Sequence, residues 1–283
     1  MNSNLVTDNP ELTYVPKKKG RRRRPSTGRR IILACLCAVL VFAAVIGGLY
    51  YMGYRYEKVE LENGEVITFL GMIKDGEPVK GRITYSNGLV GELDGDTGVI
   101  TYTNGSRYKG ELGDDFRKNG HGALTFASGN IYEGSFKSDA MTGIASLKYA
   151  NGDTYVGDFT DGKKNGNGTY TWADGSVYTG GFANDLRHGK GTFTAADGSG
   201  YSGDYNMGIK EGQGTATYEN GDTYTGEFSS DMRHGKGTYL WKNGEKYEGD
   251  FKENNITGHG TYTWPSGRSY TGEFENGMMV YPE

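Results

Sequence analysis

The chain has 283 residues, a length that suits one or two ordinary domains. Its 48 Gly, 22 Tyr and only 6 Pro exclude an ordinary globular core, and they are typical of tight turns that join short aromatic strands. Residues 1–30 carry nine of the 31 Lys/Arg and two of the 35 acids, a net charge of +7. The remaining 22 basic and 33 acidic residues give the rest of the chain −11. A basic tail and an acidic body indicate different surroundings.

An uncharged segment of 24 residues, 31–54, separates the tail from the body. About 20 apolar residues cross a bilayer as a helix, so this length is sufficient. Both cysteines, Cys35 and Cys37, lie in it, and tyrosines gather at its far end. A cleaved signal peptide or a loosely matching twin-arginine signal is an alternative. A lipoprotein signal does not fit, because Cys35 stands at the start of the apolar run and not at its end. We favour a retained signal anchor, because the leader is long and the segment has no clear cleavage site.

The polybasic block before this segment sets the expected topology. We predict a disordered cytoplasmic tail over residues 1–30, a transmembrane helix over residues 31–54, and a repeat region outside the cytoplasm, in the position of a single-pass cell-surface protein. The tail is a candidate for contact with anionic lipid. We expect no nucleic acid partner, because a positive-inside determinant accounts for the tail more simply.

The body contains an internal repeat of 23 residues, with one interval of 24. Each unit has a Tyr-x-Gly triplet, and each has a turn glycine that follows Asn, Asp or Ser. The triplets begin at Tyr108, Tyr132, Tyr155, Tyr178, Tyr201, Tyr224, Tyr247 and Tyr270. Self-similarity at this period is the mark of a repeat architecture.

Within one unit, Gly168–Phe182, two alternating runs flank an Asp-Gly turn, which predicts a β-hairpin. A three-residue loop over residues 173–175 pairs Tyr170 with Tyr178 and places the aromatic residues on one face and threonines on the other. A two-residue loop would separate the two tyrosines. Pro265 stands where the first loop residue falls in the last unit, and this supports the longer loop.

This register arranges aromatic residues in columns across the array. One column holds tryptophans and tyrosines and is interrupted by Ala195, and Ala216 replaces a strand aromatic. We therefore predict an all-β fold: an elongated single-layer antiparallel sheet over residues 105–283, with degenerate capping repeats over residues 55–104. Two strands per repeat give an advance of roughly 10 Å per unit.

The pattern Tyr-x-Gly-Asp/Glu-Phe followed by Gly-x-Gly-Thr-Tyr resembles the MORN repeat (membrane occupation and recognition nexus). Residues 247–251 and 234–239 match it closely, and the resemblance covers about residues 60–280. It implies a twisted single-layer sheet that serves in protein interaction, scaffolding or membrane association. Ala145, Ala216 and Gly181 depart from the pattern and put local packing in doubt.

The body offers no catalytic constellation. Its four His occupy repeat positions too far apart to bind one metal, and no nucleophile set converges. We therefore expect no enzyme activity, no cofactor and no metal. The expected function is a membrane-tethered binding scaffold for a protein or an envelope glycan. Lipid association and self-assembly as a structural spacer are the alternatives.

The candidate ligand contacts are large aromatic side chains of the columns. The alternative for each is packing in the core. The candidates are Trp172, Trp241, Trp264, Tyr178, Tyr201, Tyr224 and Tyr247.

Overall fold

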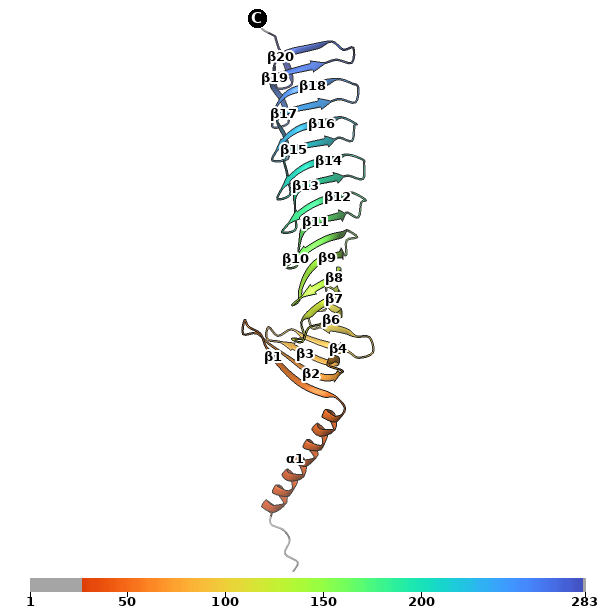
Figure 1. The fold of residues 1–283 in the computed structure, drawn as a ribbon, viewed down its shortest axis with the longest axis vertical. Helices are drawn as coiled ribbons and strands as arrows, with labels where there is room; N and C mark the ends of the chain where they lie inside the picture. Colours follow the sequence, from red (N-terminus) through yellow and green to blue (C-terminus); the bar gives the residue numbers. More distant parts are fainter. Residues whose placement is uncertain (1–26, 282–283) are drawn as a thin grey trace, which may run out of the picture. The chain divides into compact units, whose positions relative to one another are not determined.

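The computed structural model describes residues 27–281, with side chains described from residue 31 on. The chain divides into two units, one ending at Met52 and one beginning at Gly53. The first contains helix α1 (Thr27–Tyr51), drawn as a coiled ribbon in Figure 1. The helix therefore includes residues 27–30, assigned above to the tail, and ends three residues earlier than predicted. The rest of the predicted tail, residues 1–26, lies outside the described residues.

The second unit is one antiparallel sheet of 21 strands, in which each strand pairs with the next along the chain. The predicted all-β, single-layer hairpin array is confirmed. The strands are β1 (Tyr54–Glu60), β2 (Val66–Lys74), β3 (Glu77–Tyr85), β4 (Val90–Asp94), β5 (Val99–Tyr102), β6 (Arg107–Leu112), β7 (Lys118–Thr125), β8 (Ile131–Lys137), β9 (Ala140–Lys148), β10 (Thr154–Thr160), β11 (Lys163–Thr171), β12 (Val177–Ala183), β13 (Leu186–Thr194), β14 (Gly200–Asn206), β15 (Ile209–Thr217), β16 (Thr223–Ser229), β17 (Met232–Leu240), β18 (Lys246–Lys252), β19 (Asn255–Thr263), β20 (Ser269–Glu275) and β21 (Met278–Val280).

The hairpin turns have the predicted three-residue loop. Tyr170 pairs with Tyr178, and the backbone N–H of Trp172 donates to the Ser176 carbonyl at 2.9 Å. Gly175, the last loop residue, has a φ of 92°. Only glycine adopts this conformation without strain, which explains the turn glycine of every unit.

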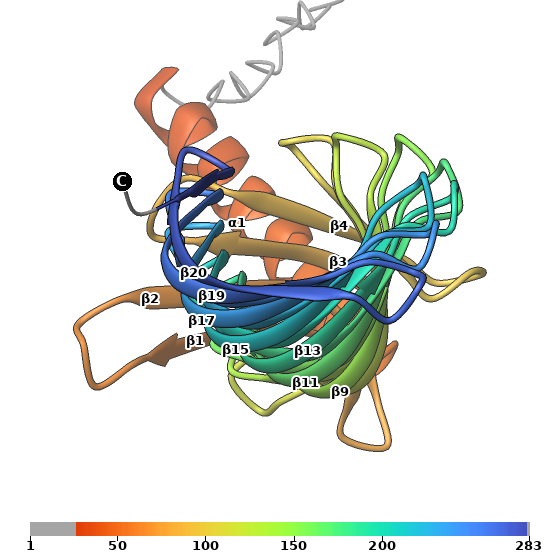
Figure 2. The same ribbon diagram turned by 90° about the horizontal axis from the view of Figure 1, so that it is seen from above.

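The sheet is curved across its width (Figure 2), and its two surfaces differ. We call the surface that bears the tyrosine column the aromatic face. The opposite surface, the threonine face, carries exposed cross-strand hydroxyl pairs such as Thr169–Thr179 and Thr215–Thr225, with Oγ1 atoms 3.2 and 3.1 Å apart. Such pairs suit a solvated β surface.

A row of paired glycines crosses the array on the aromatic face, one on each strand from Gly157 to Gly272. The tyrosine rings lie directly on this row: a Cβ at Gly214 would overlap the ring of Tyr201. The row is what lets a sheet of one layer bury large rings, because the missing side chains leave room for them.

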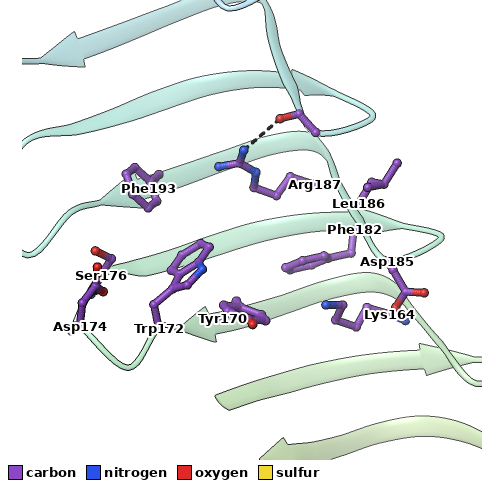
Figure 3. A pocket seen from close by; sticks show the side chains of 11 residues that line it. Lys164, Tyr170, Trp172, Asp174, Ser176, Phe182, Asp185, Leu186, Arg187 and Phe193 are labelled. Atoms are coloured by element: carbon purple, nitrogen blue, oxygen red, sulfur yellow. Dashed lines mark hydrogen bonds between the residues drawn. The ribbon is translucent and has the colours of Figure 1, made fainter. Parts of the chain in front are cut away.

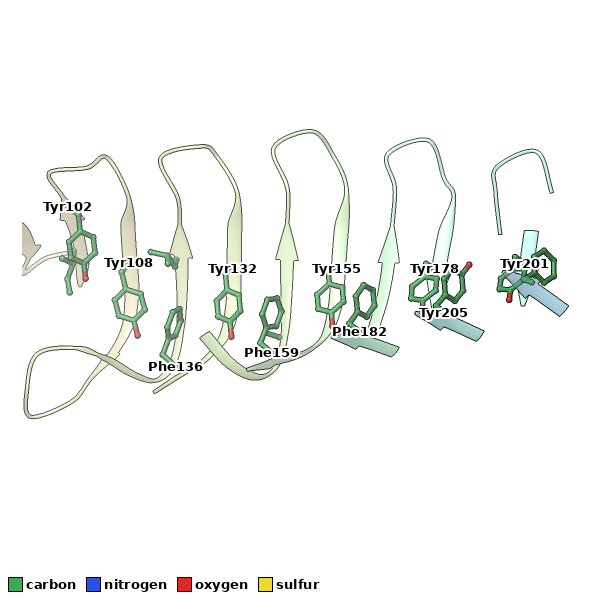
Figure 4. Close-up of a cluster of buried hydrophobic side chains, with 14 of the residues drawn as sticks. Tyr102, Tyr108, Tyr132, Phe136, Tyr155, Phe159, Tyr178, Phe182, Tyr201 and Tyr205 are labelled. Atoms are coloured by element: carbon green, nitrogen blue, oxygen red, sulfur yellow. The ribbon is translucent and has the colours of Figure 1, made fainter. Parts of the chain in front are cut away.

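The tyrosine and phenylalanine columns form the core of the array (Figure 4). Tyr155 packs edge-on against Phe159 of its own strand at 5.3 Å and against Phe182 of the next repeat at 5.1 Å, measured between ring centroids. Its hydroxyl donates to the Asp158 carbonyl at 3.1 Å. Each ring thus joins one repeat to the next, and the geometry recurs along the array.

The turn between consecutive repeats adds a polar tie. The backbone N–H of Lys164 donates to Asp185 Oδ1 at 3.0 Å, and the N–H of Asp185 donates back to the Lys164 carbonyl at 3.0 Å. Lys210 and Asp231 repeat the exchange two units later. These reciprocal bonds satisfy backbone groups that the strand ladder leaves open.

Strands β1–β5 have an aliphatic core instead of the tyrosine column, with Ile67, Phe69, Ile83 and Ile100 buried. The loop before β7, where the repeat interval is 24 residues, brings Phe116 into this region. Its ring stacks on Phe69 with centroids 5.0 Å apart. The assignment of residues 55–104 as capping repeats remains an interpretation. Strands β2 and β3 have nine residues each, as many as β11 of the array.

Candidate binding face

Half-buried rings on the aromatic face stand beside the buried columns and form two clusters. In the first ring cluster, the ring centroid of Trp172 lies 4.6 Å from that of Tyr170 and 5.4 Å from that of Phe193. The ring centroids of Tyr170 and Tyr149 are 5.7 Å apart. The second ring cluster continues along the same columns with centroid distances of 4.6 to 5.9 Å. Its members are Tyr218, Tyr239, Trp241, Tyr262 and Trp264.

The three predicted tryptophans, Trp172, Trp241 and Trp264, belong to these clusters and are half-buried, so each keeps surface for a ligand. Their role in binding stays a prediction.

The four predicted tyrosines do not share this surface. Tyr178, Tyr224 and Tyr247 are 0% exposed and Tyr201 is 2% exposed. Each is covered on the glycine row by the aromatic ring four residues on in its own strand, which is Tyr205 for Tyr201 and a phenylalanine for the others, and by the ring of the next repeat. The prediction that they contact a ligand is therefore corrected: they are core residues.

A hollow of about 530 Å³ opens beside Trp172 (Figure 3). Tyr170, Phe182 and Phe193 supply apolar walls, and Lys164 and Arg187 supply cationic ones. A second hollow of about 510 Å³ lies beside Trp241 and Trp264 at the other end of the aromatic face. The first hollow combines ring surface with several charged groups, and the second combines it with the single carboxylate of Glu245. Ligand sites commonly have apolar walls with a few polar groups.

A column of cations borders the rings, and sequence reasoning missed it. The Lys164 ammonium lies 4.9 Å from the centroid of the Tyr170 ring, and the guanidinium groups of Arg187 and Arg233 lie 4.8 and 4.9 Å from Tyr205 and Tyr239. Burial lowers the pKa of Lys164 below its usual range. The signal was present in the sequence, because positions 164, 187, 210 and 233 follow the 23-residue period.

Two buried carboxylates, Asp153 and Asp222, anchor the ring clusters. Asp153 accepts the Tyr170 hydroxyl at 2.6 Å and the backbone N–H of Ala173 at 2.9 Å, and these bonds hold the pKa of its carboxyl below the usual range. Asp222 is held in the same way by the N–H of Lys242 and the hydroxyl of Tyr239. Both therefore stay ionised and fix the ring that faces them.

The acids that follow most of the Tyr-x-Gly triplets have a structural role as well. Asp158 Oδ2 accepts the backbone N–H of Asn167 at 2.8 Å, and Asp204 and Asp250 accept the equivalent groups of Gln213 and His259. Each carboxylate thereby holds the middle of a Gly-x-Gly element. Over residues 27–281 no three His, Cys, Asp or Glu side chains group as a metal site would.

The repeat pattern was compared with known families. The model of the MORN repeat matches residues 117–131, 132–154, 155–177, 178–200, 201–223, 224–246, 247–267 and 270–280, more than half of the chain. The chain belongs to the MORN repeat family. The resemblance inferred from the sequence is thereby confirmed for the repeats, and the match begins at Arg117, just before β7.

Searches among individual proteins add little to the family assignment. No curated protein matches this MORN repeat chain. The TCP10 domain of CPAP from Danio rerio is 13% identical, with a TM-score of 0.34 over 76% of this chain and 93% of that one. The TCP domain of SAS-4 from Drosophila melanogaster, in complex with a proline-rich motif of Ana2, is 10% identical, with a TM-score of 0.23 over 77% and 88%. Scores this low carry no argument about this protein.

Proposed function

We propose that this MORN array is a non-catalytic binding scaffold, tethered to a membrane by α1, that presents its aromatic face outside the cytoplasm to a protein or an envelope glycan. The observation that carries the proposal is the set of half-buried rings, Trp172, Trp241 and Trp264, each beside a hollow, on a sheet whose stability depends on other columns. Amphipathic rings of this kind supply much of the energy of protein interfaces.

Helix α1 supports the tether. Its residues Ile31–Tyr51 are long and apolar enough to cross a membrane, although a signal sequence near an N-terminus has the same properties. Large side chains such as Leu40 and Phe42 are each 68% exposed. A bilayer would cover this apolar surface at little cost.

Site-specific photo-crosslinking in intact cells tests the binding face. A photoreactive residue at Ala173 or Lys242, both exposed and adjacent to a tryptophan, is compared with one at Thr179 or Thr225 on the threonine face. We expect crosslinks to a defined protein or glycan from the first pair only. Equal yields from both faces, or none from either, would refute the proposed binding face.

Topology has its own test. Protease added to intact cells should degrade the repeats and spare the basic tail if the array lies outside the cytoplasm. Protection of the repeats would place the binding partner in the cytoplasm instead and refute this part of the proposal.

The two alternatives are separated by simple measurements on the full chain. Flotation with anionic vesicles would support lipid association by the repeats, against the expectation from their acidic charge. Sedimentation in detergent would show oligomers if the chain assembles with itself.

A further inference from the structure

The two ring clusters are separated by a gap of one ring pair. In three of four successive contacts between repeats a pair of rings packs together: Trp172–Phe193, Tyr218–Tyr239 and Trp241–Tyr262, with centroids 5.4 to 5.9 Å apart. The equivalent pair between the first two of these contacts is Ala195 and Ala216. Both rings are thus replaced at the same contact, and among residues 27–281 no ring contact joins Phe193 to Tyr218. We call this place the ring gap.

The cation column is centred on the ring gap. Lys164 and Arg187 precede it along the array, and Lys210 and Arg233 follow it. The same column position holds Met141 one repeat before this run and Ile256 one repeat after it. Lys118, two repeats before the run, is a further cation at this position, with its ammonium 5.2 Å from the centroid of the Tyr102 ring. The four repeats around the gap are the ones that place cations at this position in an unbroken run. The carboxylates of Asp185 and Asp231 lie near Lys164 and Lys210 and offset part of this positive charge.

A third peculiarity falls in the same repeat. Tyr205 is the one tyrosine in a column that otherwise holds Phe136, Phe159, Phe182, Phe228, Phe251 and Phe274. Its ring is 3% exposed, and its hydroxyl is buried without a hydrogen-bond partner. The equivalent Phe182 lines the hollow beside Trp172, so Tyr205 stands at the wall of the ring gap. An unpartnered buried hydroxyl is costly and indicates a polar group that arrives with a ligand.

We propose that the ring gap is the docking site for an extended acidic segment of a partner protein. The segment seats one bulky apolar side chain between the two ring clusters and pairs its carboxylates with Arg187 and Lys210. The walls, Phe193 on one side and Tyr218 on the other, are rings that the fold already holds in place. This inference rests on the proposed function, and it selects a protein over a glycan because the flanking groups are cations at the very repeats where the rings are missing.

The test uses the full chain in nanodiscs and a display library of random linear peptides, followed by calorimetric titration of the selected peptides. We expect the selected peptides to combine an aromatic or large aliphatic residue with nearby acids. The double variant Ala195→Trp, Ala216→Phe fills the gap with the residues of the preceding repeat, so the fold should accept it. We expect it to weaken binding about tenfold to hundredfold, since it removes the burial of one large side chain.

Two further variants complete the design. Phe126→Trp enlarges a ring of the same column outside both ring clusters and should leave affinity unchanged. The double variant Arg187→Met, Lys210→Ile installs residues that the column holds elsewhere, and it should weaken binding and reduce its dependence on salt. Thermal melting verifies that each variant is folded.

The outcomes separate this inference from the proposed function. If the selected peptides bind the gap-filled variant with the same affinity as the wild type, the ring gap is not their docking site. The proposed binding face would not be affected by that result. A library that yields no binder would overturn the inference. The inference would also be overturned if an acidic oligosaccharide, oligogalacturonate, binds where peptides do not and the gap-filled variant loses that binding. Absence of all crosslinks from the aromatic face would remove the proposed function itself.

Discussion

The cap hairpin β2–β3 and a hairpin of the array such as β10–β11 solve the same problem with different residues. In both, a ring lies over a cross-strand glycine pair in the same register: Phe69 over Gly71 and Gly81, and Tyr155 over Gly157 and Gly168. In the array the ring is covered by the phenylalanine of the next repeat. In the cap it is covered by Phe116, which comes from a loop.

This difference shows which part of the unit propagates. The ring over the glycine pair is common to both regions and defines the hairpin. The tyrosine hydroxyl and the following phenylalanine occur in the array, where each repeat must both receive and offer a contact. Phe116 ends that series, because its ring stacks flat on Phe69.

Alkaline pH should act most strongly, and on the array first. Burial raises the pKa of Tyr224 and Tyr247 to about 12, above the ordinary value of 10.0. The folded array therefore holds protons that the unfolded chain releases above pH 10, so this stability is present below pH 10 and is lost as the pH rises toward 12. Phenolate absorbance should appear together with loss of strand signal. Burial also raises the pKa of Tyr85, but this is the one tyrosine of β2–β3, so the amides of that hairpin should still resist hydrogen exchange when the tyrosine-rich array has opened. Smooth ionisation near pH 10 with the fold intact would contradict this.

Removing the Phe116 ring, which covers Phe69 in the cap, should cause the largest loss of stability of any single substitution proposed. Phe116 is 4% exposed, and its replacement by Ala should cost about 3–5 kcal/mol of unfolding free energy in the cap. Phe116→Gly should be less harmful than Phe116→Ala, because residue 116 has a φ of 60° that glycine adopts freely. Chemical denaturation followed by hydrogen exchange measures both. Equal losses in the two variants would argue against the backbone contribution.

Placing a methyl group in the glycine row should come next. Gly214→Ala pushes a Cβ into the ring of Tyr201 and should cost about 1–3 kcal/mol, the usual range for overpacking. Gly198→Ala is the matched control: nothing lies within 4 Å of its Cβ, and its φ of 85° makes the loss a backbone effect only. The loss of unfolding free energy in the double variant Gly214→Ala, Tyr201→Ala should be closer to the loss in Tyr201→Ala alone than to the sum of the two single losses. Full additivity would show that the ring and the methyl group do not meet.

The smallest effect should follow from replacing a tyrosine of the array by phenylalanine, the residue that lies over the glycine pair in the cap. Tyr178→Phe removes only the hydrogen bond from its hydroxyl to the Gly181 carbonyl at 3.0 Å, and it should cost about 1 kcal/mol. Thermal unfolding measures the change, and Tyr281→Phe, at a residue 67% exposed, serves as the control. A loss as large as that of Gly214→Ala would mean that the hydroxyl, and not the ring on the glycine pair, defines the unit.

Much of this architecture follows from sequence periodicity. The 23-residue period, the Asx-Gly turns and the alternation of Thr with aromatic residues are local features, and each restricts the backbone of its own hairpin. Together they determine the single-layer sheet, the three-residue loop and the assignment of every column to one face. The helix end was less well predicted, because uncharged residues continue past Tyr51, whereas the chain turns at Gly53, where φ is 93°.

Which aromatic residues face solvent was decided only by the tertiary structure. Tyr178 and Trp172 lie on the same face of one hairpin, and alternation along a strand cannot distinguish them. The glycine row leaves room for the Tyr178 ring to lie buried. Trp172 stays half-exposed because it stands beside the turn. The stacking of Phe116 and the grouping of cations around the ring gap also depend on contacts between repeats, which no single repeat encodes. The physical reason is that alternation assigns a side chain to a face, whereas burial depends on what the neighbouring strands place beside it.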